Sequence, residues 1–153
     1  MAKSNPNALT LKTFADTDSG KNVKKVNSVK EVFRMAKISE FQIQKDFFTQ
    51  IILDPKLKKY RRLIFAVPNG GSRNIVEASR MKQAGVTAGV SDVLCLIPRS
   101  HYHGLCIEFK SGSNRISEHQ KEFRNAVEEQ GYRYEVCYST EEALKILVAY
   151  LGL

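Results

Sequence analysis

A hairpin of two apolar runs, from Gly89 to Lys110, constrains most strongly what this chain can fold into. Side chains alternate between the two faces of a strand, so Glu108 and Lys110 share one face of the second run and Phe109 lies on the other. The other positions of that run are apolar, which predicts burial on both faces, as in a central strand. A carboxylate and an ammonium are costly to bury there unless the protein uses them.

Asp92 begins the first run of the hairpin, so its carboxylate is expected beside Glu108 and Lys110. Two carboxylates beside a lysine suit a hard divalent cation and an activated water molecule. Such a set of groups can hydrolyse a phosphodiester. Each residue also has a simpler explanation: Asp92 as a turn residue, and the Glu108/Lys110 pair as charges on a solvated edge strand. Because the three occur together in one hairpin, the pattern favours a metal-dependent nuclease.

Apolar periodicity, cap residues and turn residues predict the remaining elements. Helices are expected over 29–37, 40–53, 74–83 and 117–130 and from Thr140 onward, and strands over 63–67, 92–97, 105–110 and 133–138. The pair Asp54-Pro55 is expected to end the second helix. Residues 1–27 are predicted to be a flexible basic arm, and residues 28–153 a single domain.

The helix over 40–53 has a glutamate where apolar residues are expected. At 100° per residue, its apolar arc comprises Phe41, Ile43, Phe47, Phe48, Ile51 and Ile52. Glu40 and Gln44 fall in the middle of this arc. Glu40 also follows Ser39, the expected cap, where a negative charge favours the helix dipole. A core-facing role and a dipole role both stay open for Glu40.

Gln120 also has two interpretations. It lies three residues after Ser117, and this spacing predicts a capping box at the start of a helix. With Phe123 and Val127 it forms an i, i+3, i+7 series, so its side chain is expected to face inward. Both interpretations can hold for the same side chain.

The net charge of +8 and the pI near 9.5 suit a polyanionic partner, either nucleic acid or an anionic membrane surface. The lysines do not gather on one amphipathic helix, and no apolar run approaches the roughly 20 residues of a bilayer span, so no membrane partner is expected. The first ten residues lack the apolar segment of a secretory signal, which favours a cytoplasmic protein.

The chain has an odd number of cysteines, three in all, and each lies in an apolar, strand-like run: Cys95, Cys106 and Cys137. This pattern is typical of small buried thiols in a reducing compartment. Cys95, Cys106 and the two histidines between their strands, His101 and His103, match the spacing of no common zinc module, so zinc is disfavoured.

The chain resembles the virus-type replication–repair nuclease (VRR-NUC) branch of the PD-(D/E)XK superfamily, from about Ser39 to Leu151. The motifs that carry the resemblance are Pro68-Asn69-Gly70-Gly71-Ser72-Arg73-Asn74, Met81-Lys82, Gly85, Gly89-Val90-Ser91-Asp92, Gly104-Leu105, Ile107-Glu108-Phe109-Lys110, Ser117, Gln120 and Gly131-Tyr132. The family usually has proline before its catalytic aspartate, and this chain has Ser91, which leaves the carboxylate available. The resemblance implies a restriction-endonuclease-like α/β core, a central mixed four-stranded sheet flanked by helices.

The resemblance also implies roles for single residues. Asp92 and Glu108 would bind Mg²⁺ or Mn²⁺, with the Phe109 carbonyl as a further ligand, and Glu40 would complete the site through water. Lys110 would orient the attacking water or stabilise the pentavalent phosphate, and Gln120 would position Lys110, water or phosphate. The DNA backbone contacts are expected from Asn69, Gly70, Gly71, Arg73 and Arg80.

Members of this branch that stand alone resemble phage or prophage proteins, and the family is tied to replication, repair and branched DNA. The resemblance therefore implies a structure-specific endonuclease, for example on four-way (Holliday) junctions, acting in the host bacterial cytoplasm. One small chain with one active site would have to pair to cut two strands, so a C2 homodimer is expected. A nucleic-acid-binding module without catalysis, a restriction-type nuclease and an RNA-directed nuclease stay open as alternatives.

Overall fold

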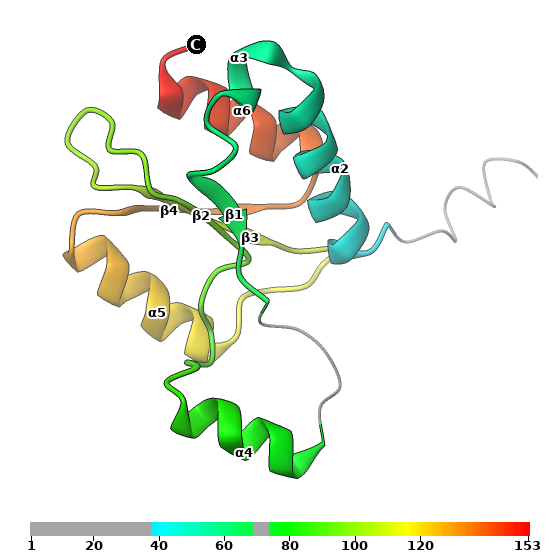
Figure 1. Ribbon diagram of the computed structural model, residues 1–153, viewed down its shortest axis with the longest axis vertical. Coiled ribbons are helices and arrows are strands. Elements are labelled where there is room, and N and C mark those ends of the chain that lie inside the picture. The colour runs from blue at the N-terminus through cyan, green and yellow to red at the C-terminus, as the bar shows by residue number, and fades with distance from the viewer. Residues whose placement is uncertain (1–37, 69–73) are drawn as a thin grey trace, which may run out of the picture. The chain divides into compact units, whose positions relative to one another are not determined.

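A computed structural model describes residues 38–68 and 74–153 (Figure 1). In chain order its elements are α2 (Glu40–Leu53), α3 (Pro55–Lys58), β1 (Ile64–Ala66), α4 (Ile75–Gln83), β2 (Val93–Cys95), β3 (Leu105–Phe109), α5 (Glu118–Glu129), β4 (Arg133–Cys137) and α6 (Thr140–Leu151). The predicted arm over 1–27 and the predicted helix over 29–37 lie outside the described residues.

The four strands form one mixed sheet in the order β1-β2-β3-β4. The pairs β1–β2 and β2–β3 are antiparallel, which confirms the predicted hairpin, and β3–β4 is parallel. A parallel pair needs a long crossover connection, and α5 supplies it. The predicted class, an α/β fold with a mixed four-stranded sheet flanked by helices, is confirmed.

Helices cover both faces of the sheet (Figure 1). Phe109 of β3 lies on the face that α2 and α6 cover, and its ring packs edge-on against Phe47 of α2, with centroids 5.6 Å apart. Glu108 lies on the opposite face, which it shares with Tyr134 of β4. The ring of Tyr134 meets Phe123 of α5 at 6.5 Å. The strand that carries Glu108 is therefore buried on both faces, as expected.

The buried stripe of α2 is narrower than its apolar residues predict. Ile43, Phe47 and Ile51 are buried, whereas Phe41 is 73% exposed and Ile52 is 48% exposed. The prediction that Phe41 and Ile52 face the core is wrong, because the helix contacts the sheet along one i, i+4, i+8 line only. Glu40 lies three residues before Ile43, at the beginning of this line.

Three short elements differ from the expected pattern, and one of them is β2, which covers Val93–Cys95 rather than the predicted 92–97. Strand β1 is shorter than the predicted 63–67, although backbone hydrogen bonds from Val67 and Leu96 extend the ladder beyond both of its ends. Helix α3 is absent from the sequence prediction. Asp54 ends α2 and also caps α3, since its side chain accepts a hydrogen bond from Lys56 N at 2.7 Å, and Pro55 occupies the first helical position.

The three cysteines are free and buried, as predicted. Cys95 and Cys106 lie on opposite faces of the sheet, because Cys106 pairs with Leu94, the neighbour of Cys95. The hypothetical zinc set of Cys95, His101, His103 and Cys106 therefore does not converge. Within residues 38–68 and 74–153, no helix has the length and apolar character needed to cross a membrane.

Candidate active site

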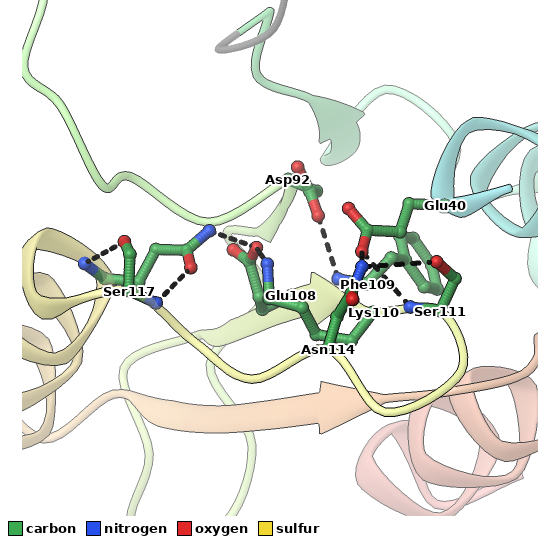
Figure 2. A network of polar contacts seen from close by, with 9 residues as sticks. Glu40, Asp92, Glu108, Phe109, Lys110, Ser111, Asn114 and Ser117 are labelled. Atoms are coloured by element: carbon green, nitrogen blue, oxygen red, sulfur yellow. Dashed lines mark hydrogen bonds and ion pairs between the residues drawn. The ribbon is translucent and has the colours of Figure 1, made fainter.

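The candidate site lies where β2 begins and β3 ends (Figure 2). Asp92 directly precedes β2, and its Oδ2 accepts a hydrogen bond from Phe109 N at 2.8 Å. This bond turns the carboxylate toward the backbone of β3, as Figure 2 shows. The hairpin thus brings Asp92 beside Glu108 and Lys110, as the sequence pattern predicts.

Glu108 and Lys110 form a buried ion pair. Their residues are 1% and 7% exposed, and Lys110 Nζ donates to Glu108 Oε1 at 2.7 Å. The second carboxylate oxygen, Glu108 Oε2, is buried and has no hydrogen-bond partner among the described residues. A buried carboxylate oxygen without a partner is energetically unfavourable, which makes Oε2 a position where a cation would be favoured.

Gln120 has both of its predicted roles, as a helix-capping residue and as a side chain that faces inward. Its Oε1 accepts from Ser117 N at 2.8 Å and its backbone N–H donates to Ser117 Oγ at 3.3 Å, so the capping box is present. The box uses the amide oxygen, and the amide nitrogen then donates to Glu108 Oε1. The direct partner of Gln120 is therefore Glu108 rather than Lys110. Any contact of Gln120 with water or phosphate remains a prediction.

Glu40 reaches the site from the first turn of α2. Its Oε1 accepts from Ser111 N at 3.1 Å and from Asn114 Nδ2 at 3.0 Å (Figure 2). The turn that holds Ser111 and Asn114 directly follows Lys110, and Gly112 within it has a φ of +57°. Ser111 and Asn114 were missed in the sequence, where Ser111–Asn114 has the composition of an ordinary turn.

The electrostatics of the site favour a positive ion. Burial raises the pKa of Glu108 to about 7, although its hydrogen bond to Lys110 lowers the pKa and the charge of Asp92 raises it. Burial also raises the pKa of Asp92, the hydrogen bond from Phe109 and the charge of Lys110 lower it, and Glu40 raises it. The charges of Asp92 and Glu40 thus disfavour ionisation of Glu108, and the charge of Glu40 disfavours ionisation of Asp92.

The donor set fits a hard divalent cation. Among the described residues, no three His, Cys, Asp or Glu side chains form a ready-made cage for an ion. Mg²⁺ does not need such a cage, because it keeps several waters and is commonly bound by one or two carboxylates together with substrate phosphate. Asp92 and Glu108, with the unpartnered Oε2, offer that kind of site.

Tyr134 is a further polar group near the site that sequence reasoning missed, because it lies in an apolar strand pattern. Its side chain is buried, and its hydroxyl has no hydrogen-bond partner among the described residues. Burial raises the pKa of this hydroxyl above its ordinary value, and the charges of Glu108 and Asp92 raise it further. The hydroxyl of Tyr134 therefore stays protonated. Together with Arg124 and Arg133, Tyr134 lines a hollow of about 660 Å³.

Gly89 allows the hairpin to approach α5 closely. Its φ is +82°, and a Cβ at this position would overlap the backbone carbonyl of His119 in the first turn of α5. The residue after His119 is Gln120. The close contact at Gly89 therefore fixes the first turn of α5 in a position from which Gln120 reaches Glu108.

The predicted DNA contacts are largely beyond what the structure describes. Asn69, Gly70, Gly71 and Arg73 lie outside the described residues. Arg80 lies in the last turn of α4 and is exposed. Arg80 makes no ion pair in the described part of the chain, so its charge is available to a ligand.

A mixed four-stranded sheet with an Asp, Glu and Lys set at one hairpin defines the class of PD-(D/E)XK nucleases. Residues 30–141 match the family model of the VRR-NUC domain. The chain belongs to the VRR-NUC family and is a nuclease of the PD-(D/E)XK type.

Comparison with solved structures and with curated proteins gives different results. A solved structure described as a VRR_NUC domain protein superposes with a TM-score of 0.65 at 24% sequence identity, and the match covers 76% of this chain and 90% of the other. At that identity the likeness concerns the fold alone. No curated protein matches the chain significantly.

Proposed function

We propose that the chain is an endodeoxyribonuclease that depends on Mg²⁺ or Mn²⁺ and cuts branched DNA such as four-way junctions. The observation that carries the proposal is the convergence of Asp92, Glu108 and Lys110 on one hairpin, with Glu108 Oε2 buried and without a hydrogen-bond partner in the described part of the chain. Family membership supports the nuclease activity. The preference for branched DNA is our extension from the family resemblance.

In this proposal Asp92 and Glu108 would hold the metal ion, the Phe109 carbonyl would be a further ligand, and Glu40 would contribute through water. When bound, the ion would lower the pKa of a water molecule and offset negative charge on the phosphate. Asn114 and Ser111 orient Glu40 for this role, since both donate to its Oε1.

The side chains of the protein then position and stabilise the reacting groups. In the hydrolysis, a water oxygen bonds to phosphorus, the bond from phosphorus to the leaving sugar oxygen breaks, the water gives up a proton and the sugar oxygen gains one. Lys110 presents a positive charge beside Glu108, where it orients the water or stabilises the charge on the phosphate. Gln120 holds Glu108 Oε1, so the orientation of the carboxylate is set before substrate binds.

We also propose a two-fold homodimer with its two active sites facing a shared basic channel. Residues 38–68 and 74–153 of one chain offer one candidate site, and symmetric cutting of two strands needs a pair of sites. The net charge of +8 supports a polyanionic substrate. Light scattering during size-exclusion chromatography tests this arrangement: a monomer that cuts both strands of a junction in paired fashion would contradict it. A biological interface should bury at least roughly 1,000 Å².

The family's phage and prophage members suggest a role in phage replication and repair, inside the bacterial cytoplasm. The decisive experiment for the biochemical proposal compares duplex, splayed, flap and four-way DNA, and an RNA duplex, each with Mg²⁺, Mn²⁺, Ca²⁺ or EDTA. We expect cleavage with Mg²⁺ or Mn²⁺, binding with little turnover in Ca²⁺, and faster cutting of the four-way junction than of duplex. Full cleavage in EDTA, or preference for the RNA duplex, would overturn the proposal.

A further inference from the structure

A concentration of positive charge lies at α3, which follows the end of α2 that is farther from Glu40. Between Asp46 and Glu77 the sequence contains one acidic residue, Asp54, whose side chain is used to cap α3. Exposed lysines and an exposed arginine follow Asp54 in the chain, and the half-buried Arg99 joins them by its contact with Tyr60. We call this set the α3 basic surface, and it consists of Lys56, Lys58, Lys59, Arg62 and Arg99.

The α3 basic surface is attached firmly to the core. Leu57, between two of its lysines, is only 2% exposed. Lys59 Nζ and the Arg99 guanidinium both lie over the ring of Tyr60, at 4.9 and 5.8 Å from its centroid. Arg99 Nε also donates to Leu151 O at 3.3 Å, which joins the surface to the end of α6. These contacts hold the side chains of Lys59 and Arg99 against the protein, and the burial of Leu57 anchors the backbone that carries the neighbouring lysines.

No carboxylate neutralises this surface within the described residues. The ion pairs of the described residues involve cations outside this surface, namely Lys110, His119, Lys121, Arg124 and Arg133. An exposed, unpaired lysine or arginine binds phosphate without loss of an internal ion pair, and such contacts depend little on base sequence. The surface therefore has the charge and the exposure of a site for a nucleic acid backbone.

The length of α2 sets the separation between this surface and the carboxylates. Glu40 begins the helix and Leu53 ends it, so its 14 residues span roughly 20 Å. At 3.4 Å per base pair, that is roughly six base pairs of duplex. A DNA arm that reaches the α3 basic surface from the cut phosphate must be at least about that long.

We infer that the α3 basic surface is a second DNA-contact site, which binds backbone phosphates of a duplex arm about six base pairs from the phosphate that is cut. This inference rests on the proposed function, since it takes the substrate to be duplex-armed DNA. It differs from the contacts expected at Asn69–Arg73 and Arg80. It gives the enzyme a way to sense the length and direction of an arm without reading its sequence.

The test compares two double variants of the full chain. Lys58→Gln/Lys59→Gln removes two charges from the surface, and the matched control Lys121→Gln/Lys145→Gln removes the same net charge elsewhere. Lys121 is a suitable control because it already pairs with Glu118 at 2.7 Å. The probes are a duplex of about 30 base pairs and a hairpin-closed duplex of about four, too short to reach from the cut phosphate to the surface, and binding is measured by anisotropy in Ca²⁺ from low to high salt.

For the long duplex, the slope of log K against log salt should decrease in magnitude by about two in the surface variant, since each phosphate contact contributes about 0.9. Its affinity at physiological salt should fall roughly tenfold, while the control should match the wild type. The four-base-pair probe should bind both variants alike.

Equal loss in the two double variants would overturn the inference, because it would reflect overall charge alone. So would a slope change confined to an RNA duplex of the same sequence, since the site would then not be one for DNA. If the wild type cuts DNA and the slopes do not differ, the inference fails and the proposed function stands. If the slopes differ but no metal supports cleavage, the proposed function fails and the contact surface stands.

Discussion

The carboxylate of Asp92 accepts a hydrogen bond from the backbone N–H of Phe109, 2.8 Å away. Phe109 lies between Glu108 and Lys110 in the chain, so this one bond couples Asp92 to the backbone segment that carries both other groups. Phe109 is in turn fixed by its buried ring against Phe47. The three side chains are therefore positioned relative to one another by main-chain geometry and core packing, before any ligand arrives.

Replacing Lys110 with alanine should lower the cleavage rate by roughly two or more orders of magnitude, because it removes a positive charge that stabilises the transition state. DNA binding in Ca²⁺ should survive, since Asp92 and Glu108 remain. Asp92→Asn should lose metal affinity as well as rate. Single-turnover kinetics and calorimetric Mn²⁺ binding separate these effects. Near-normal turnover in Lys110→Ala would mean that the lysine only neutralises Glu108.

Replacing Glu108 with glutamine should stabilise the metal-free protein, and increasingly so as the pH rises from about 4.5 to about 7. Burial raises the pKa of Glu108 from 4.5 to about 7 in the folded state. Between these values the unfolded chain releases the proton first, so the wild type loses stability with rising pH, by on the order of 3 kcal/mol in full. The amide introduced by Glu108→Gln is neutral at every pH, and its oxygen can still accept a hydrogen bond from Lys110.

Urea unfolding in EDTA at several pH values measures this difference. Below pH 4.5 the two proteins should converge, because Glu108 is then protonated in both the folded and the unfolded state. Mg²⁺ at pH 7.5 should raise the Tm of the wild type and leave that of Glu108→Gln almost unchanged. Parallel pH curves for the two proteins would show that Glu108 titrates in its ordinary range.

Replacing Gln120 with glutamate separates its two contacts. Glutamate at this position keeps a capping box, because its oxygen can still accept from Ser117 N. It loses the N–H that donates to Glu108 and places a second negative charge there. We expect near-wild-type helix stability and at least a tenfold lower kcat.

The matched variant is Ser117→Ala, which removes the hydroxyl cap and leaves the amide. It should reduce stability by about 1 kcal/mol and affect kcat less than Gln120→Glu does. Circular dichroism melts and cleavage rates on the same preparations make the comparison. If both variants lose activity in proportion to their stability, Gln120 is a capping residue alone.

Replacing Glu40 with glutamine tests whether its charge matters. The amide oxygen can still accept from Ser111 and Asn114, so the local geometry should persist. We expect a severalfold to tenfold slower reaction and a higher Mn²⁺ requirement. A helix-dipole role alone predicts a stability loss of about 0.3–1 kcal/mol with unchanged cleavage. Asn114→Ala, which removes one donor to Glu40, should slow the reaction less than Glu40→Gln does.

The sequence predicted well those parts of the fold that depend on local chemistry. Ser39 and Ser117 cap helices as expected, because capping needs only nearby residues. The hairpin that joins Asp92 to Glu108 follows from strand alternation and a short connection. These local rules also place Glu40 and Gln120 on the inner sides of their helices.

Other features depend on contacts between distant parts of the chain. Phe41 is apolar yet exposed, since burial along α2 is decided by where the sheet lies. The contact of Asn114 with Glu40 joins residues 74 positions apart, and no local pattern indicates it. Tyr134 looks like any strand tyrosine until its pairing places it on the face of Glu108.

The capping box at Ser117 makes the first turn of α5 part of the candidate active site. The same amide that closes the helix end also holds Glu108, so fraying of that turn would release the carboxylate at the same moment. We therefore expect activity to be lost on heating when this single helical turn frays, which can precede unfolding of the whole domain. Thermal adaptation of such a protein would begin at residues 117–120 rather than in its core.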